Sequence, residues 1–166
     1  TPPEYRRQAL LKGIELTMAQ KQVTNTIAML DYFSTQYPQD SALDVAQLTL
    51  GELRLKQYLA AGTNAPAGDT NLLLQAVTNL SRVVTGFTNS PLVAGAYFQR
   101  GWCFAHLGRV AESAADFAQA ARRLPVSEDQ ATALFKLAEA QTQLGEHTNA
   151  IVQLRQLLAR YTDFAA

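Results

Sequence analysis

Apolar residues recur at helical spacing in four short windows that resemble one another along the chain. The windows read VTNTIAML from residue 23, LLQAVTNL from 73, VAESAADF from 110 and HTNAIVQL from 147. Each has a small residue in its fourth place, a large apolar residue in its eighth, and a third position of the same stripe three places later. Residues three or four apart share one face of an α-helix, so each window predicts an amphipathic helix. The small residues are Thr26, Ala76, Ser113 and Ala150, the large ones are Leu30, Leu80, Phe117 and Leu154, and the later ones are Phe33, Val83, Ala120 and Leu157.

A second helix is predicted before each window. The clearest copies are SPLVAGAYFQRGWCFAHLG from residue 90 and SEDQATALFKLAEAQTQLG from residue 127. Ser90 and Ser127 suit the N-cap position, and Gln130 stands where a capping box with Ser127 would place it. Gly108 and Gly145 suit the left-handed residue that ends many helices. Each first helix also carries a small residue near its middle, where a neighbouring helix could approach closely. These small residues are Gly13, Gly51, Gly101 and Ala138.

The windows divide the chain into four helix pairs. They start 50, 37 and 37 residues apart, and the longer first interval contains AAGTNAPAGDT, residues 60–70, which reads as an inserted loop. The pairs fall at approximately 4–38, 41–88, 90–125 and 127–162. No strand pattern competes with them. We therefore expect one all-α domain built from repeats, because a helix pair of this size buries its apolar face by stacking on the next.

The third pair resembles the tetratricopeptide repeat (TPR) family. Its large and small residues have the family's spacing, although Ser113 stands where the family prefers Ala, and Gln141 in the fourth pair where it prefers an aromatic residue. The resemblance implies an α-α superhelix of about four antiparallel helix pairs, whose concave face, lined by the first helices, binds a peptide or partner protein. The residues that carry it are Tyr97, Gly101, Phe104, Gly108, Phe117, Ala120 and Pro125.

The turns QYPQDSAL and FTNSPLVA are similar to those of bacterial cell-envelope members, such as outer-membrane assembly lipoproteins of the BamD type and the Tol-Pal coordinator. This similarity favours the bacterial periplasm or envelope, and the cytoplasm is the alternative.

Residues on the first helices are the candidates for partner contact. Phe98 and Trp102 lie one helical turn apart, and the corresponding places in the fourth pair hold Phe135 and Glu139. Two interpretations are open: the aromatic residues form an anchor patch for a partner, or Phe98 and Phe135 pack between adjacent first helices. The family's chaperone carboxylate clamp is not expected, because the matching places lack its Lys and Asn. The earlier pairs contribute Leu48, Glu52, Ile14 and Met18.

Charge balance and residue spacing argue against several other classes of function. Lys plus Arg and Asp plus Glu are 14 each, without a cationic cluster, which disfavours a nucleic-acid partner. No apolar run approaches the roughly 18 residues of a membrane span, so no direct membrane insertion is expected. His106 and His147 lack metal-ligand spacing, no phosphate-binding loop is present, and Cys103 reads as a buried hydrophobe rather than a reactive thiol. We therefore expect a protein that is not an enzyme and binds no cofactor.

Two non-catalytic functions follow from this pattern. The first is a protein–protein interaction scaffold, with a groove of first helices that binds a peptide or partner protein. The second is a structural or self-associating segment of a larger multi-repeat or envelope assembly, with a homodimer through the C-terminal repeat. The second rests on the ending RYTDFAA, which shows no polar capping helix and suggests either a fragment of a longer repeat protein or an end that another molecule covers.

Overall fold

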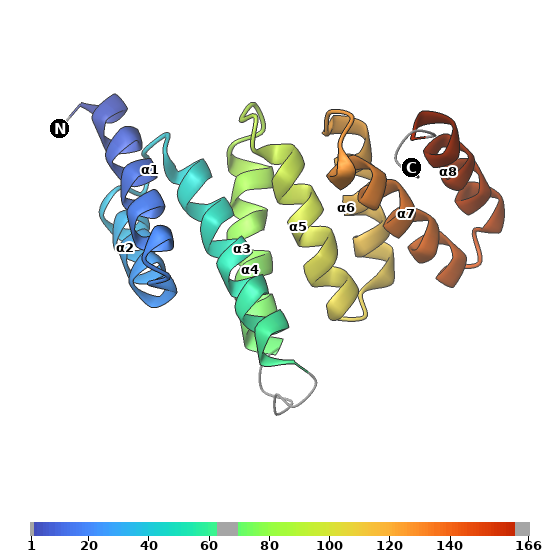
Figure 1. Cartoon of the computed structure of the whole chain (residues 1–166), viewed down its shortest axis with the longest axis horizontal. Coiled ribbons are helices and arrows are strands. Elements are labelled where there is room, and N and C mark those ends of the chain that lie inside the picture. Colours follow the sequence, from blue (N-terminus) through green and yellow to red (C-terminus); the bar gives the residue numbers. More distant parts are fainter. Residues whose placement is uncertain (1, 63–69, 162–166) are drawn as a thin grey trace. The chain divides into compact units, whose positions relative to one another are not determined.

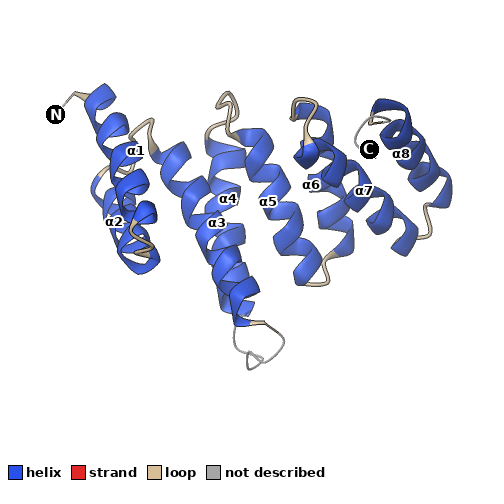
Figure 2. Cartoon of the chain, viewed as in Figure 1, coloured by secondary structure: helices blue, strands red, loops and turns tan. Residues whose placement is uncertain are grey.

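The computed structural model describes residues 2–62 and 70–161 of the 166-residue chain. The described residues form eight helices and no strand, which confirms the all-α prediction of four antiparallel helix pairs (Figures 1 and 2). Most of the loop predicted at 60–70 lies outside the described residues. The helices are α1 (Pro3–Ala19), α2 (Val23–Gln36), α3 (Leu43–Ala61), α4 (Thr70–Gly86), α5 (Val93–His106), α6 (Val110–Arg123), α7 (Glu128–Gln143) and α8 (His147–Arg160).

The chain divides into two compact units. Unit 1, Thr1–Val93, contains α1 to α4, and unit 2, Ala94–Ala166, contains α6 to α8 and all of α5 except its first residue. In unit 1, α2 packs against α1 and α3, and α3 packs against α4. In unit 2, α7 packs against α6 and α8. The prediction of a single domain stays a prediction.

The repeated windows form the buried face of the second helices, as predicted. The small residues of the fourth place are all buried, and Leu30, Leu80 and Phe117 are almost completely enclosed. The last window differs, because Leu154 exposes 37% of its surface and Ile151 exposes 50%. The prediction that Leu154 shares the packed face of the other three large residues is therefore wrong. The apolar stripe of α8 is present, and α8 packs against α7 with Ala150 buried and Leu157 partly buried against the core of unit 2.

The small residues of the first helices allow close approach within a pair. A Cβ placed on Gly51 would lie 2.5 Å from Cγ of Leu80, and one on Gly101 would lie 3.1 Å from the Phe117 ring. Glycine at these places lets each first helix contact the large residue of the following window. This confirms the predicted role for Gly51 and Gly101.

The helix ends agree with the sequence in part. Gly108 and Gly145 have φ angles of 71° and 79°, as predicted for left-handed stops. Oγ of Ser127 accepts a hydrogen bond from the backbone N–H of Gln130 at 3.2 Å, as an N-cap should. The predicted capping box is only half formed, because the Gln130 side chain instead donates to carbonyl groups near the end of α6. Ser90 does not open α5 either; its Oγ accepts from the backbone of Leu92 in the turn that precedes the helix.

Polar pairs fasten the helices of each unit. In unit 1, Asp44 on α3 accepts hydrogen bonds from Arg7 on α1 and from Ser90 in the turn after α4, each at 2.7 Å. In unit 2, Arg100 on α5 donates two hydrogen bonds to Asp116 on α6, at 2.7 and 2.8 Å. Two parallel bonds from one guanidinium fix orientation as well as distance. These pairs therefore hold the first helices in a defined position.

Candidate protein-binding site

Trp102 on α5 is half-buried and packs on the core of unit 2. Its ring makes edge contacts with Phe98 and Phe117, at centroid distances of 6.4 and 5.7 Å. Nζ of Lys136 lies 4.9 Å from the Trp102 ring centroid, and the His106 ring stacks on it at 6.1 Å. The indole is thus held by aromatic neighbours and partly covered by Lys136.

A hollow of about 150 Å³ lies beside the indole. Among its lining residues are Trp102 and Glu139, two of the predicted site residues, and Lys136, which bonds Glu139 at 2.7 Å. Small-molecule pockets usually measure about 300–1,000 Å³. A hollow of this size therefore suits one side chain of a partner better than a free small molecule.

The aromatic surface in the structure contains fewer of the residues that the sequence predicts for it. Phe98 exposes only 8% of its surface and belongs to the core cluster of unit 2, so little of it remains for a partner. Phe135 exposes 43%, and Nζ of Lys136 lies 5.7 Å from its ring centroid. Trp102 and Phe135 therefore flank one lysine.

The sequence did not point to Lys136. Its only local signal was the three-residue spacing to Glu139, which is common on helix surfaces. Its position over Trp102 depends on how α5 and α7 approach each other.

The predicted site residues of unit 1 lie on α1 and α3. Ile14 and Met18 are partly buried and pack against the core cluster of unit 1. Leu48 and Glu52 are half-buried on α3. A single groove that joins these residues to Trp102 stays a prediction.

Two titratable groups near Trp102 have pKa values that burial shifts. Burial raises the pKa of the Cys103 thiol to about 12, and the side chain is completely enclosed, in agreement with its interpretation as a buried hydrophobe. Burial, with a smaller effect of the Lys136 charge, lowers the pKa of His106.

In the described part of the chain, no three His, Cys, Asp or Glu side chains come close enough together to hold a metal ion. None of the described helices combines the length and apolarity that a membrane crossing needs.

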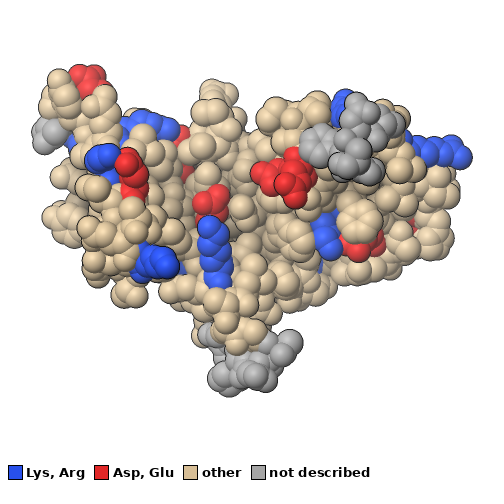
Figure 3. Space-filling view, viewed as in Figure 1, with Lys and Arg blue, Asp and Glu red and all other residues tan. Residues whose placement is uncertain are grey.

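The surface shows charges of both signs. Figure 3 shows basic and acidic side chains interspersed on the face in view, over both units, without a large area of one sign. This distribution agrees with the even charge balance of the sequence.

Comparison with known proteins places these repeats in one family. Family models described as tetratricopeptide repeats match residues 67–128 and 132–163, together more than half of the chain. The crystal structure of a thermophilic TPR protein of Thermus thermophilus is similar, with a TM-score of 0.65 and 19% identity, over 95% of this chain and 75% of that chain. At this identity the similarity shows the fold alone. No curated protein matches. The chain is therefore a tetratricopeptide repeat protein, and repeats of this family generally mediate protein–protein interaction.

Proposed function

We propose that the protein is a non-catalytic scaffold that binds a peptide or partner protein through the first helices of unit 2. The observation that carries the proposal is the surface of Trp102, Lys136 and Phe135. Trp102 is half-buried and Phe135 exposes 43% of its surface, so both aromatic rings retain area that a partner could cover. Tryptophan is enriched among the residues that dominate binding energy at protein interfaces.

The contacts of Lys136 support a partner that carries an acidic residue beside an apolar one. A partner carboxylate would compete with Glu139 for the Lys136 ammonium, and an apolar group would cover the ring that Lys136 now shields. Exposed cation–π contacts contribute about 0.5–1 kcal/mol, and exposed ion pairs about 0–1 kcal/mol. Displacing Lys136 therefore costs little compared with burial of aromatic surface.

Selection from a random peptide display library tests this proposal. Peptides that bind the wild-type protein should lose most of their affinity for Phe135→Ala, and for Trp102→Phe, which keeps an aromatic ring against Phe98 and Phe117. Tyr32→Ala is the matched control, because Tyr32 lies on α2 and exposes 65% of its surface. Peptides that bind both site variants as tightly as the wild type would refute the assignment.

A second candidate is self-association through the fourth helix pair. The exposed apolar side chains of α8 favour it, and they include Val152 at 53% and Leu158 at 71%. A second copy of the chain could cover this stripe. Light scattering after size exclusion should then show a dimer that Leu158→Glu converts to a monomer, and a wild-type monomer at high concentration would exclude it.

The finer assignment to cell-envelope members rests on the turn sequences alone. Fractionation of the native bacterial cells with an antibody against the chain tests it, and a purely cytoplasmic signal would contradict it.

A further inference from the structure

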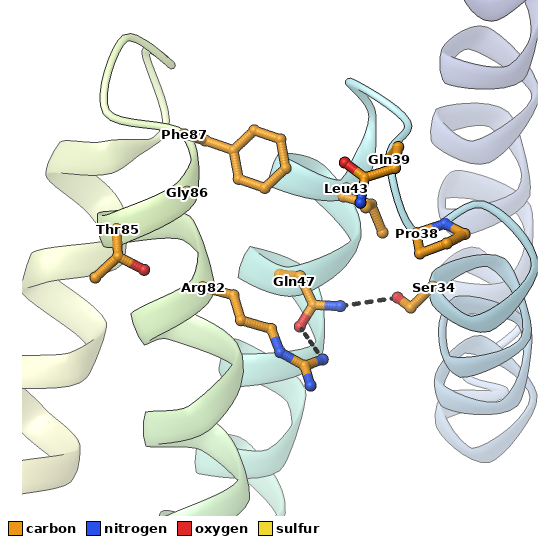
Figure 4. A pocket seen from close by; sticks show the side chains of 9 residues that line it. All are labelled: Ser34, Pro38, Gln39, Leu43, Gln47, Arg82, Thr85, Gly86 and Phe87. Atoms are coloured by element: carbon orange, nitrogen blue, oxygen red, sulfur yellow. Dashed lines mark hydrogen bonds between the residues drawn. The ribbon is translucent and has the colours of Figure 1, made fainter.

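Unit 1 contains a hollow that none of the predicted site residues lines. It has a volume of about 490 Å³ and lies among α2, α3 and α4 and the turns that follow α2 and α4 (Figure 4). Ligand sites commonly measure about 300–1,000 Å³, so this hollow can take several groups of a ligand. It involves the second helices of the first two pairs, and Trp102 lies in the other unit.

One side of the hollow is polar and preorganised. Gln47 on α3 is 2% exposed; its Nε2 donates to Oγ of Ser34 at 2.8 Å, and its Oε1 accepts from Nδ2 of Asn79 at 2.7 Å. Arg82 reaches from α4 toward the same Oε1, at the long distance of 3.5 Å (Figure 4). Since Asn79 already satisfies Gln47, the Arg82 guanidinium could turn to a ligand without leaving a buried oxygen unpaired.

No acidic side chain among the described residues pairs with Arg82. No acidic side chain is among the described residues that line the hollow, and Arg82 forms no ion pair within residues 2–62 and 70–161. Other arginines of unit 1 are paired: Arg7 with Asp44, and Arg54 with Asp31. The hollow thus offers a guanidinium with free donors, which match a carboxylate in geometry and charge.

The other side of the hollow is apolar. Leu43 on α3 and Phe87 after α4 line it together with Pro38, and Figure 4 shows the Phe87 ring directed toward Leu43. An apolar wall beside an unpaired cation favours a ligand with an apolar group next to its negative charge. A small inorganic anion would leave the apolar wall unused.

A comparable hollow in unit 2 is also lined by positively charged side chains. A hollow of about 410 Å³ lies among α6, α7 and α8, and its lining includes two arginines and four glutamines but no described acidic residue. Arg160 in this lining and Gly86 in the first hollow both hold the fourteenth place of their windows. Oε1 of Gln141, which also lines this hollow, is buried without a hydrogen-bond partner among the described residues. A hollow with arginine and no described acidic residue in its lining therefore lies between successive second helices in each unit, although Arg82 holds the tenth place of its window and Arg160 the fourteenth.

We propose that the hollow among α2, α3 and α4 is a second binding site, which takes a peptide carboxylate carried beside an apolar group. Arg82 would bind the carboxylate, and Leu43 and Phe87 would pack against the apolar part. The carboxylate could be the C-terminus of a peptide or a glutamate side chain. This site goes beyond the Trp102 surface, and either could exist without the other.

Titration of the arginine Nε–Hε signals by ¹H–¹⁵N NMR tests the site. N-acetyl-phenylalanine, which has a free carboxylate, should shift the Arg82 signal and the Phe87 ring signals in a saturable way, while N-acetyl-phenylalaninamide should not. N-acetyl-glutamyl-phenylalaninamide distinguishes the source, because its only carboxylate is on a side chain and it keeps the phenyl group; saturation by this probe indicates a side-chain carboxylate and saturation by the first a chain terminus. The Trp102 indole signal should stay in place throughout, which separates this site from the proposed scaffold surface.

Matched variants complete the test. Arg82→Gln should weaken N-acetyl-phenylalanine binding at least tenfold, read from the Phe87 ring, and Arg155→Gln on α8 should leave it unchanged. Arg82 is exposed, and a circular dichroism spectrum confirms that the variant remains folded. Equal shifts by the acid and the amide, equal movement of Arg82 and Arg155, saturation by inorganic phosphate alone, or unchanged binding to Arg82→Gln would each overturn the proposal.

Discussion

Gly51→Ala should destabilise unit 1, although alanine is the better helix former. The added Cβ would lie 2.5, 2.7 and 3.1 Å from Cγ, Cδ2 and Cδ1 of Leu80, where carbon atoms ordinarily stay about 3.5–4.0 Å apart. Leu80 is fully buried, and its Cγ is not a free end that can move aside. Overpacking costs about 1–3 kcal/mol, and the glycine-to-alanine change in a helix returns about 1 kcal/mol. The short Cγ contact places the cost near the upper end, so a net loss of about 2 kcal/mol is expected.

A double-mutant cycle isolates this contact. Leu80→Ala alone should cost about 2–5 kcal/mol, and adding Gly51→Ala to it should be neutral or stabilising, because the new methyl group then enters the vacated space. Urea unfolding followed by far-UV circular dichroism measures all four proteins. Gly13→Ala is the control, since its Cβ meets the flexible end of Met29 at Sδ and should change stability little. A Gly51→Ala protein as stable as the wild type, or an equal cost in both backgrounds, would refute the reasoning.

Two further predictions concern titratable groups. Cys103 should not react with a thiol reagent at pH 8 in the native protein, because its side chain is enclosed and its pKa is raised to about 12. It should react fully in denaturant. Fast labelling of the native protein, at a rate that urea does not change, would contradict this. Burial alone would raise the pKa of Asp44, but hydrogen bonds from Arg7, Ser90 and the Val45 amide, with the Arg7 charge, hold it below 3.8. The folded carboxyl therefore binds protons less readily than the unfolded one, and its stabilisation, present above pH 3.8, is lost as pH falls through the lowered pKa. Asp44→Asn should consequently cost about 1–3 kcal/mol at pH 7 and progressively less below pH 3.8, measured by urea unfolding across pH, and a cost that does not change with pH would contradict the assignment.

The scaffold could be predicted from the sequence because its signals are local. Leu30, Leu80 and Phe117 occupy the same place in three windows, and helical periodicity alone puts that place on one face. Leu154 shows the limit of this reasoning. The pattern identifies an apolar face, but whether another helix covers that face depends on packing that the window does not contain.

The candidate sites could be predicted only in part. Trp102 stood out as the single tryptophan on a first helix, but its cover by Lys136 requires the approach of α5 to α7. The hollow beside Arg82 combines residues from three helices and two turns, and none has a distinctive spacing in the sequence. For Gln130, two sets of hydrogen-bond partners compete. Its spacing to Ser127 fits a capping box, yet its side chain donates to carbonyl groups at the end of α6.

The indole signal of Trp102 gives the most direct test of the proposed scaffold function. The chain has one tryptophan, so a ¹H–¹⁵N spectrum contains a single indole Nε1–H resonance. Titration with a display-selected peptide should move this resonance in a saturable way, with the Kd that calorimetry gives for the same peptide, and Phe135→Ala should weaken both together. An indole resonance that stays unmoved while calorimetry shows saturation would contradict partner binding at this surface.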